Sequence, residues 1–231
     1  MKKITLPTSN LLEVNNFQDL VSTPFQGFIN AISWKRELVG DFEEIVQAII
    51  FNGNMVEIDE KDLINLDLSE AGKLAREILL TDFKLLKEHG ASPVLNIINN
   101  YEEDEHPFFP TDVYSFHIDR STIATDTFLC TYFGETSELI SNDEVVQKIQ
   151  VHATREKLLQ IYEGKAANFD SFLQENFFDL HYQALPKSTV ISTKIGHLLR
   201  LAVDFPESHI KPCVHRAPRE NIGRKRLLMI C

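Results

Sequence analysis

The sequence predicts one α+β domain over residues 1–231, with a β core braced by N-terminal helices. Apolar residues recur at helical spacing within residues 1–92, whereas short runs of strand composition bounded by turn residues fill residues 93–133 and 188–231. Residues 134–187, between the two strand blocks, return to helical spacing. We therefore expect an N-terminal helical layer, a β core built from two separated blocks, and a helical insertion that serves as a lid or as a packing element.

Two helices are expected in the N-terminal layer. Asp41 stands three residues before Glu44 and opens an apolar pattern that ends at Gly53, which is typical of a capped amphipathic helix. Ser69 opens a longer pattern that ends at Gly90. Both helices should cover one face of the β core.

The two blocks of the β core are separated by helical sequence. Within the insertion, we expect a helix from Asp143 to about Glu163 and a shorter one from Phe169 to Phe178. The strands expected in the two blocks are residues 94–98, 113–119, 127–133, 189–192, 197–203, 213–215 and 224–230.

Length and charge limit the functions that fit the chain. With 231 residues, 43% of them hydrophobic, the chain can bury one good core. Its 34 acidic residues outnumber 23 basic ones, and a net charge of −11 disfavours general binding to nucleic acid or to an anionic membrane. A small-molecule substrate fits better, and the acidic run at residues 102–105 favours a cationic one. The oligomeric state is open, and a homodimer is one option.

The sequence indicates a cytoplasmic protein without a membrane segment. It has no apolar run of about 18 residues, and residues 1–7 lack the apolar centre of a signal peptide. The three cysteines are widely spaced with no Cys-x-x-Cys, which indicates neither a disulfide framework nor a zinc ribbon.

One strand-like stretch carries candidate metal ligands. His117 and Asp119 are two residues apart, so on a strand both side chains leave the same face, within reach of one ion, while Phe116 and Ile118 should pack against the helices. The stretch should form a hairpin with residues 127–133. Two imidazoles and one carboxylate are the ligand set of non-haem Fe(II) oxygenases, so a second histidine from a distant strand would complete the site.

The second block of strands offers that histidine. His215 is preferred, and His209 and His197 are alternatives. Cys213 shares a strand face with His215 and could approach a metal, although such a cysteine is more often a small core residue.

A basic residue on the last strand and two residues of 127–133 are candidates for binding a cosubstrate. Arg226 is favoured by its spacing from His215 over Arg224 and Lys225, and an arginine that faces the core needs an anion, which a dicarboxylate would supply. Which face of 127–133 points inward is undetermined, so Thr131 and Tyr132 both qualify, and Tyr132 fits the core equally well.

The order and spacing of these residues resemble those of the 2-oxoglutarate/Fe(II)-dependent oxygenases. His117-Ile118-Asp119, the later His215 and Arg226 eleven residues beyond it carry the resemblance. It implies a double-stranded β-helix core of the cupin or jelly-roll type, iron held by His117, Asp119 and His215, and 2-oxoglutarate with its distal carboxylate on Arg226. Dioxygen would be the other cosubstrate, and the product would be a hydroxylated small polar metabolite such as a free amino acid. Hydroxylation is favoured because Asp119 fills the position that related halogenases leave free for chloride.

A closer resemblance covers more of the chain. An uncharacterised bacterial domain family has similar segments, in which His-x-Asp is followed by Thr-Tyr-x-Gly-Pro-Gly-Thr-Glu-Trp. This chain keeps the Thr-Tyr-x-Gly start and departs from the pattern at Glu135, Ser137 and Leu139. The similar segments are residues 28–36, 130–138, 214–218 and 226–228.

Two alternatives to an oxygenase stay open. The same ligand types bind zinc well, so the chain could be a cupin-like protein that binds zinc or iron without catalysis. It could also be a structural or interaction protein in which His117 and Asp119 have no chemical role.

Overall fold

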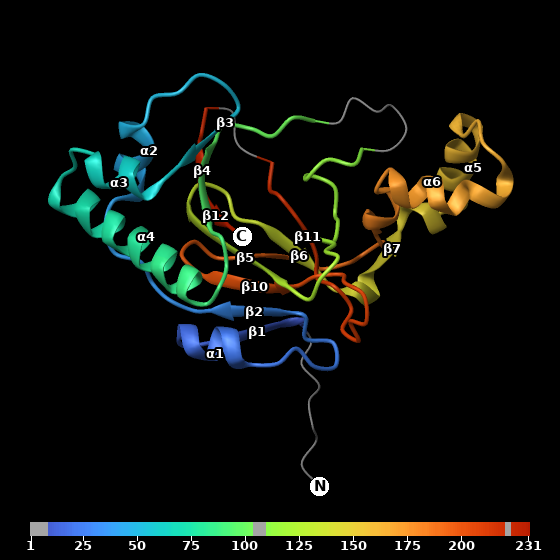
Figure 1. Ribbon diagram of the computed structural model, residues 1–231, viewed down its shortest axis with the longest axis horizontal. Coiled ribbons are helices and arrows are strands. Elements are labelled where there is room, and N and C mark those ends of the chain that lie inside the picture. The colour runs from blue at the N-terminus through green and yellow to red at the C-terminus, as the bar shows by residue number, and fades with distance from the viewer. Residues whose placement is uncertain (1–8, 104–109, 220–222) are drawn as a thin grey trace, which may run out of the picture.

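The computed structural model describes residues 9–103, 110–219 and 223–231 (Figure 1). It is a mixed α and β fold with a large, mainly antiparallel sheet and, within the described residues, six α-helices. Helices α2, α3 and α4 lie at one end of the molecule's longest dimension, and α5 and α6 lie at the other (Figure 1). None of the helices in the described ranges combines the length and the apolar character needed to cross a membrane.

Both predicted helix starts in the N-terminal part are confirmed. Asp41 caps α2 (Phe42–Ala48) and Ser69 caps α4 (Glu70–Glu88), each accepting a hydrogen bond from a backbone N–H of the first turn. Helix α2 ends short of Gly53 because the chain turns extended after Ala48 and leaves Ile50 in solvent. The layer is not purely helical. Its other elements are β1 (Leu11–Val14), α1 (Phe17–Ser22), β2 (Ala31–Trp34), β3 (Met55–Ile58) and α3 (Glu60–Asn65).

The large sheet has seven strands in the order β1-β2-β10-β5-β12-β4-β3, of which only β1 and β2 pair in parallel. Its central strands were predicted from sequence: β4 (Val94–Ile98), β5 (Asp126–Phe133), β10 (Leu198–Ala202) and β12 (Arg226–Ile230). The predicted hairpin between the His117 stretch and β5 is wrong, because β5 pairs with β10 on one side and β12 on the other.

A small sheet faces the large one. It consists of β11 (Val214–Arg216), β6 (Glu138–Ile140) and β9 (Val190–Ser192), and a separate ribbon pairs β7 (Val145–Gln147) with β8 (Tyr182–Ala184). The stretch around His117 runs between β11 and the residues leading into β8, joined by isolated bridges to His215 and His181. It is extended but not a regular strand, since Asp112 accepts hydrogen bonds from the N–H groups of Tyr114 and Ser115 and turns the chain just before it.

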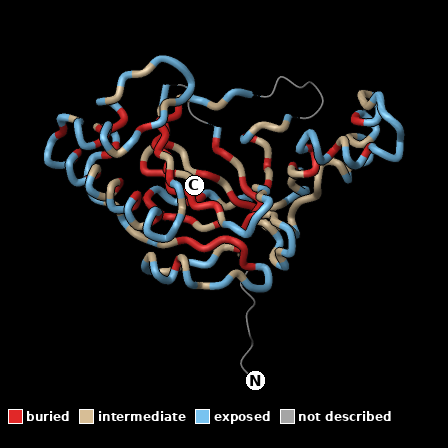
Figure 2. The backbone as a smooth tube through the Cα atoms, in the orientation of Figure 1, coloured by how far each residue is buried: buried red, intermediate tan, exposed pale blue. Residues whose placement is uncertain are grey.

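Buried side chains form separate clusters on the two faces of the large sheet. Phe128, Cys130 and Tyr132 of β5 pack against the N-terminal helices, whereas Leu129 packs with Leu139 of the small sheet in the interior between the sheets. This alternation is the period-two pattern of a strand covered on both faces. Figure 2 shows the buried chain concentrated in these central strands.

The insertion has a small core of its own. Helices α5 (His152–Ile161) and α6 (Phe169–Glu175) share an apolar cluster with Phe178. The predicted helix from Asp143 is wrong in its first half, where Val145–Gln147 forms β7 by pairing with β8. Phe116 and Ile118 were expected to pack against the N-terminal helices, but they pack with Leu180 and Val214, on the other side of the small sheet.

Candidate metal centre

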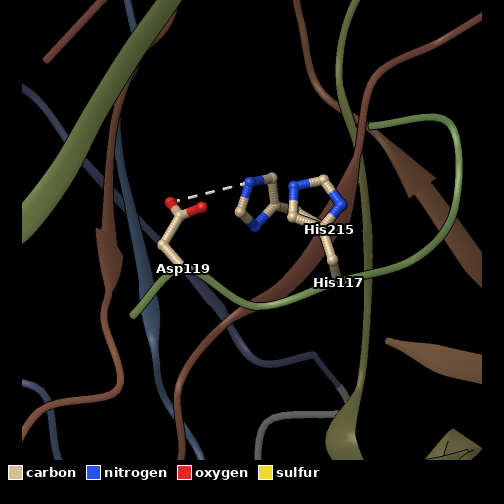
Figure 3. Close-up of side chains that lie close together, drawn as sticks. All are labelled: His117, Asp119 and His215. Atoms are coloured by element: carbon tan, nitrogen blue, oxygen red, sulfur yellow. Dashed lines mark ion pairs between the residues drawn. The ribbon is translucent and has the colours of Figure 1, made fainter. Parts of the chain in front are cut away.

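Three predicted ligands lie together at one end of the interior. The donor atoms of His117, Asp119 and His215 all lie within 4.8 Å of one another, and the Asp119 carboxylate faces the two imidazoles (Figure 3). His215 Nε2 is 3.8 Å from Asp119 Oδ2, and the two imidazole centroids are 4.6 Å apart. The group therefore has the size and donor types of a site for one metal ion.

Backbone pairing explains why the ligands meet. The N–H of His117 donates to the carbonyl of His215 and the N–H of His215 donates to the carbonyl of His117, both at 2.9 Å. Residues paired in this way project their side chains from the same face of the sheet. Asp119 is two residues further along an extended chain, so its carboxylate reaches the same side.

Hydrogen bonds to neighbouring groups orient all three ligands. His117 Nδ1 lies 2.7 Å from the carbonyl oxygen of Ser115, and His215 Nδ1 lies 3.2 Å from that of Cys213. Because a carbonyl only accepts, each Nδ1 carries the proton and each Nε2 is left to bind a metal. The hydroxyl of Thr127, on β5, donates to Asp119 Oδ2 at 2.5 Å and fixes the carboxylate.

The protonation states also suit a metal. Burial lowers the pKa of His117 to about 4, and the neighbouring His215 adds to the shift, so this imidazole is neutral near neutral pH. Burial acts to raise the pKa of Asp119, but His215 and the hydrogen bond from Thr127 outweigh it and hold this pKa below its usual value. A neutral imidazole and an ionised carboxylate are the forms that ligate metals.

A pocket of about 270 Å³ opens beside the ligands. His117 and Asp119 lie in its wall, and Phe177 and His181 come from the end of the insertion. Arg120 also lines it and is held at 2.6 Å from Asp179 and 2.8 Å from Asp204. The insertion therefore contributes one wall of the pocket, while its helices α5 and α6 lie away from the two sheets (Figure 1).

The candidate cosubstrate residues separate onto two faces of the large sheet. Arg226 is 1% exposed in the interior and donates to the hydroxyls of Thr131 at 3.0 Å and Ser137 at 2.8 Å. Tyr132 lies on the opposite face of β5, donates to Asp82 at 2.5 Å and stacks on Phe42. Because side chains alternate between the two faces of β5, Thr131 lies beside Arg226, whereas Tyr132 points away and is no longer a candidate for binding the cosubstrate.

The competing candidates lie elsewhere. His197 is bonded to Ser33, and His209 is exposed. Cys213 lies in the apolar interior, where burial raises the pKa of its thiol. Arg224 is mostly exposed, 3.8 Å from Glu135. Of the acidic run at residues 102–105, Asp104 and Glu105 lie outside the described residues.

Two residues at the site were not predicted. Thr127 shares a strand face with Thr131. Knowing that this face of β5 points inward would have been enough to predict Thr127 as a residue of the site. His181 was not among the candidate residues, yet it is 5% exposed beside His117. No local pattern marks it, because its position follows from pairing with a stretch more than sixty residues earlier.

The chain matches no protein-family model, no curated protein and no solved structure, so its function is inferred from the site itself.

The hydrogen bond from Thr127 to Asp119 gives a first testable prediction. Thr127→Val keeps the side-chain shape but removes the donor, and we expect metal affinity to fall about 10–100-fold, as is usual when a ligand loses its supporting hydrogen bond. Competition with a chromophoric chelator measures this. Thr131→Val, on the same face of β5 but bonded to Arg226, is the matched control and should bind metal like the wild type.

Proposed function

We propose that the protein is an Fe(II)/2-oxoglutarate-dependent dioxygenase that hydroxylates a small polar metabolite such as a free amino acid. The observation that carries the proposal is the convergence of His117, Asp119 and His215 beside a small pocket. Two imidazoles and one carboxylate leave further coordination positions open, which is the arrangement of non-haem Fe(II) oxygenases.

The path of the chain supports a double-stranded β-helix. From β4 onward, consecutive stretches alternate between the sheets: β4 in the large one, the His117 stretch bridged to β11 of the small one, then β5 in the large one again. β6 and β9 follow in the small sheet, and β10, β11 and β12 return to strict alternation. A double-stranded β-helix requires such a winding between two facing sheets, and it is the fold that the resemblance to oxygenases leads us to expect.

Arg226 supports 2-oxoglutarate as the cosubstrate. Thr127 contacts the ligand Asp119 and Thr131 contacts Arg226, and both threonines lie on the interior face of β5. Four residues of strand separate them by about 13 Å. A five-carbon dicarboxylate held by the metal at one end and by a long arginine side chain at the other would bridge this separation. The guanidinium would bind the distal carboxylate as a charge-assisted pair.

In this proposal each residue has a defined task. Iron and 2-oxoglutarate, when bound, supply with dioxygen the oxidation that replaces a C–H hydrogen of the substrate by a hydroxyl and yields succinate and CO₂. His117 and His215 present neutral Nε2 atoms to the metal, and Thr127 holds Asp119 in its ligating orientation. The pocket of about 270 Å³ limits the substrate to a small molecule.

An anaerobic titration tests the proposal. Metal-free protein is loaded with Fe(II) and then with 2-oxoglutarate, and we expect the visible charge-transfer band of an iron-bound keto acid. Arg226→Met should bind Fe(II) normally and lose most of its affinity for 2-oxoglutarate, whereas Arg224→Met, on the exposed neighbour, should behave like the wild type. Succinate formation across a panel of amino acids then identifies the substrate. Tight zinc binding without the band would instead support a non-catalytic metal-binding protein.

A further inference from the structure

A row of three imidazoles crosses the small sheet beside the metal centre. His117 is bridged to His215 on one side and to His181 on the other. Its ring centroid is 4.6 Å from that of His215 and 5.9 Å from that of His181. Because directly opposed residues of adjacent strands share a face, all three imidazoles lie on the side of the metal centre.

His181 differs from the other two in its position relative to the pocket. The described donor atoms that lie within 4.8 Å of one another belong to His117, Asp119 and His215, and His181 is outside that group. It does line the pocket together with His117 and Asp119. It is also 5% exposed, so it is a buried polar group in the wall of this pocket.

The wall around His181 is built with some strain. Phe177 adopts a left-handed backbone conformation, with φ at 58°, and its ring is largely exposed at the pocket. Bulky residues rarely adopt this conformation, and such strain concentrates at ligand-binding sites. The guanidinium of Arg120, between Asp179 and Asp204, adds an N–H-bearing group to the same wall.

We propose that His181 forms an anion-binding subsite, in which its imidazole donates a hydrogen bond to a small anionic or oxygen ligand bound at the metal's open position. This inference rests on the metal centre of the proposed function. The row geometry carries it: His181 is the next residue across from His117, too far to complete the ligand group but near enough to contact what the metal holds on the pocket side. The subsite would accept a carboxylate oxygen or a small inorganic anion.

The test uses cobalt and azide as probes. Metal-free protein is loaded with Co(II), and azide is titrated while the visible spectrum of the cobalt is followed. In His181→Leu we expect azide to bind about 10–100-fold more weakly, as for loss of a hydrogen bond to a charged group, with cobalt affinity unchanged. His181→Gln keeps an N–H donor and should recover part of the affinity. His209→Leu, at an exposed histidine away from the pocket, is the control.

Each other outcome overturns the subsite in a recognisable way. Equal azide affinity in wild type and His181→Leu would mean that His181 does not contact the ligand. A loss of cobalt affinity in both His181 variants would make His181 a metal ligand instead. Wild-type protein that binds cobalt but no azide would overturn the subsite and leave the metal centre standing. Failure to bind cobalt at all would overturn the metal centre and the subsite together.

Discussion

Replacing His117 with alanine is expected to abolish specific metal binding. The variant removes one of two imidazoles from a group with three donors, and a single imidazole and carboxylate hold a divalent ion weakly. We expect the affinity for Fe(II), Co(II) and Zn(II) to fall by more than the roughly 10–100-fold that loss of a supporting hydrogen bond costs. Competition for the metal with a chelator, at fixed pH, measures the affinity of the variant and of the wild type.

The fold should survive this change. The backbone pair between His117 and His215 uses main-chain atoms only, so alanine keeps both hydrogen bonds. Circular dichroism of the variant checks this, and His209→Ala, at an exposed alternative considered from sequence, is the matched control. Metal binding of wild-type strength in His117→Ala would show that the ion sits elsewhere, and the proposed oxygenase centre would have to be abandoned.

Local patterns in the sequence predicted local structure well. The caps at Asp41 and Ser69 are confirmed because an N-cap is decided by a few adjacent residues. The strands β4, β5, β10 and β12 are confirmed because their alternation or apolar composition is read within one segment. The spacing of His117 and Asp119 likewise placed both on one side of an extended chain, and the structure brings His215 to them.

Pairing between distant segments could not be predicted in the same way. β5 was expected to pair with the His117 stretch, its neighbour in sequence, yet it pairs with β10 and β12. Which strands pair depends on how apolar faces across the whole chain are buried together. The residues of one segment alone therefore do not determine its partner. The same limit explains why the inward face of β5 was undetermined and why the position of His181 beside His117 was missed.

Asp82→Ala is expected to destabilise the fold by about 3–5 kcal/mol, the usual cost of breaking a buried ion pair from one side. Asp82, on α4, is fully buried and accepts two hydrogen bonds from the Arg36 guanidinium and one from the Tyr132 hydroxyl. Burial alone would lower the pKa of Arg36, but the Asp82 carboxylate holds it above its usual value. Without Asp82 the arginine charge stays largely buried beside Cys130 with its main anionic partner gone.

Urea denaturation measures the free energy of unfolding that Asp82→Ala loses. Two further variants separate the contribution of the charge from that of the hydroxyl. Tyr132→Phe removes only the neutral hydroxyl donor and should cost about 1–2 kcal/mol. If Asp82→Ala costs clearly more, the ion pair with Arg36 contributes more to stability than the hydrogen bond from Tyr132. Glu70→Ala removes an exposed ion pair with Lys73 on the same helix and should leave the unfolding free energy nearly unchanged. A cost for Asp82→Ala no larger than that of Tyr132→Phe would mean that the Arg36 charge finds water or another partner, and that α4 is not anchored to β5 by this pair.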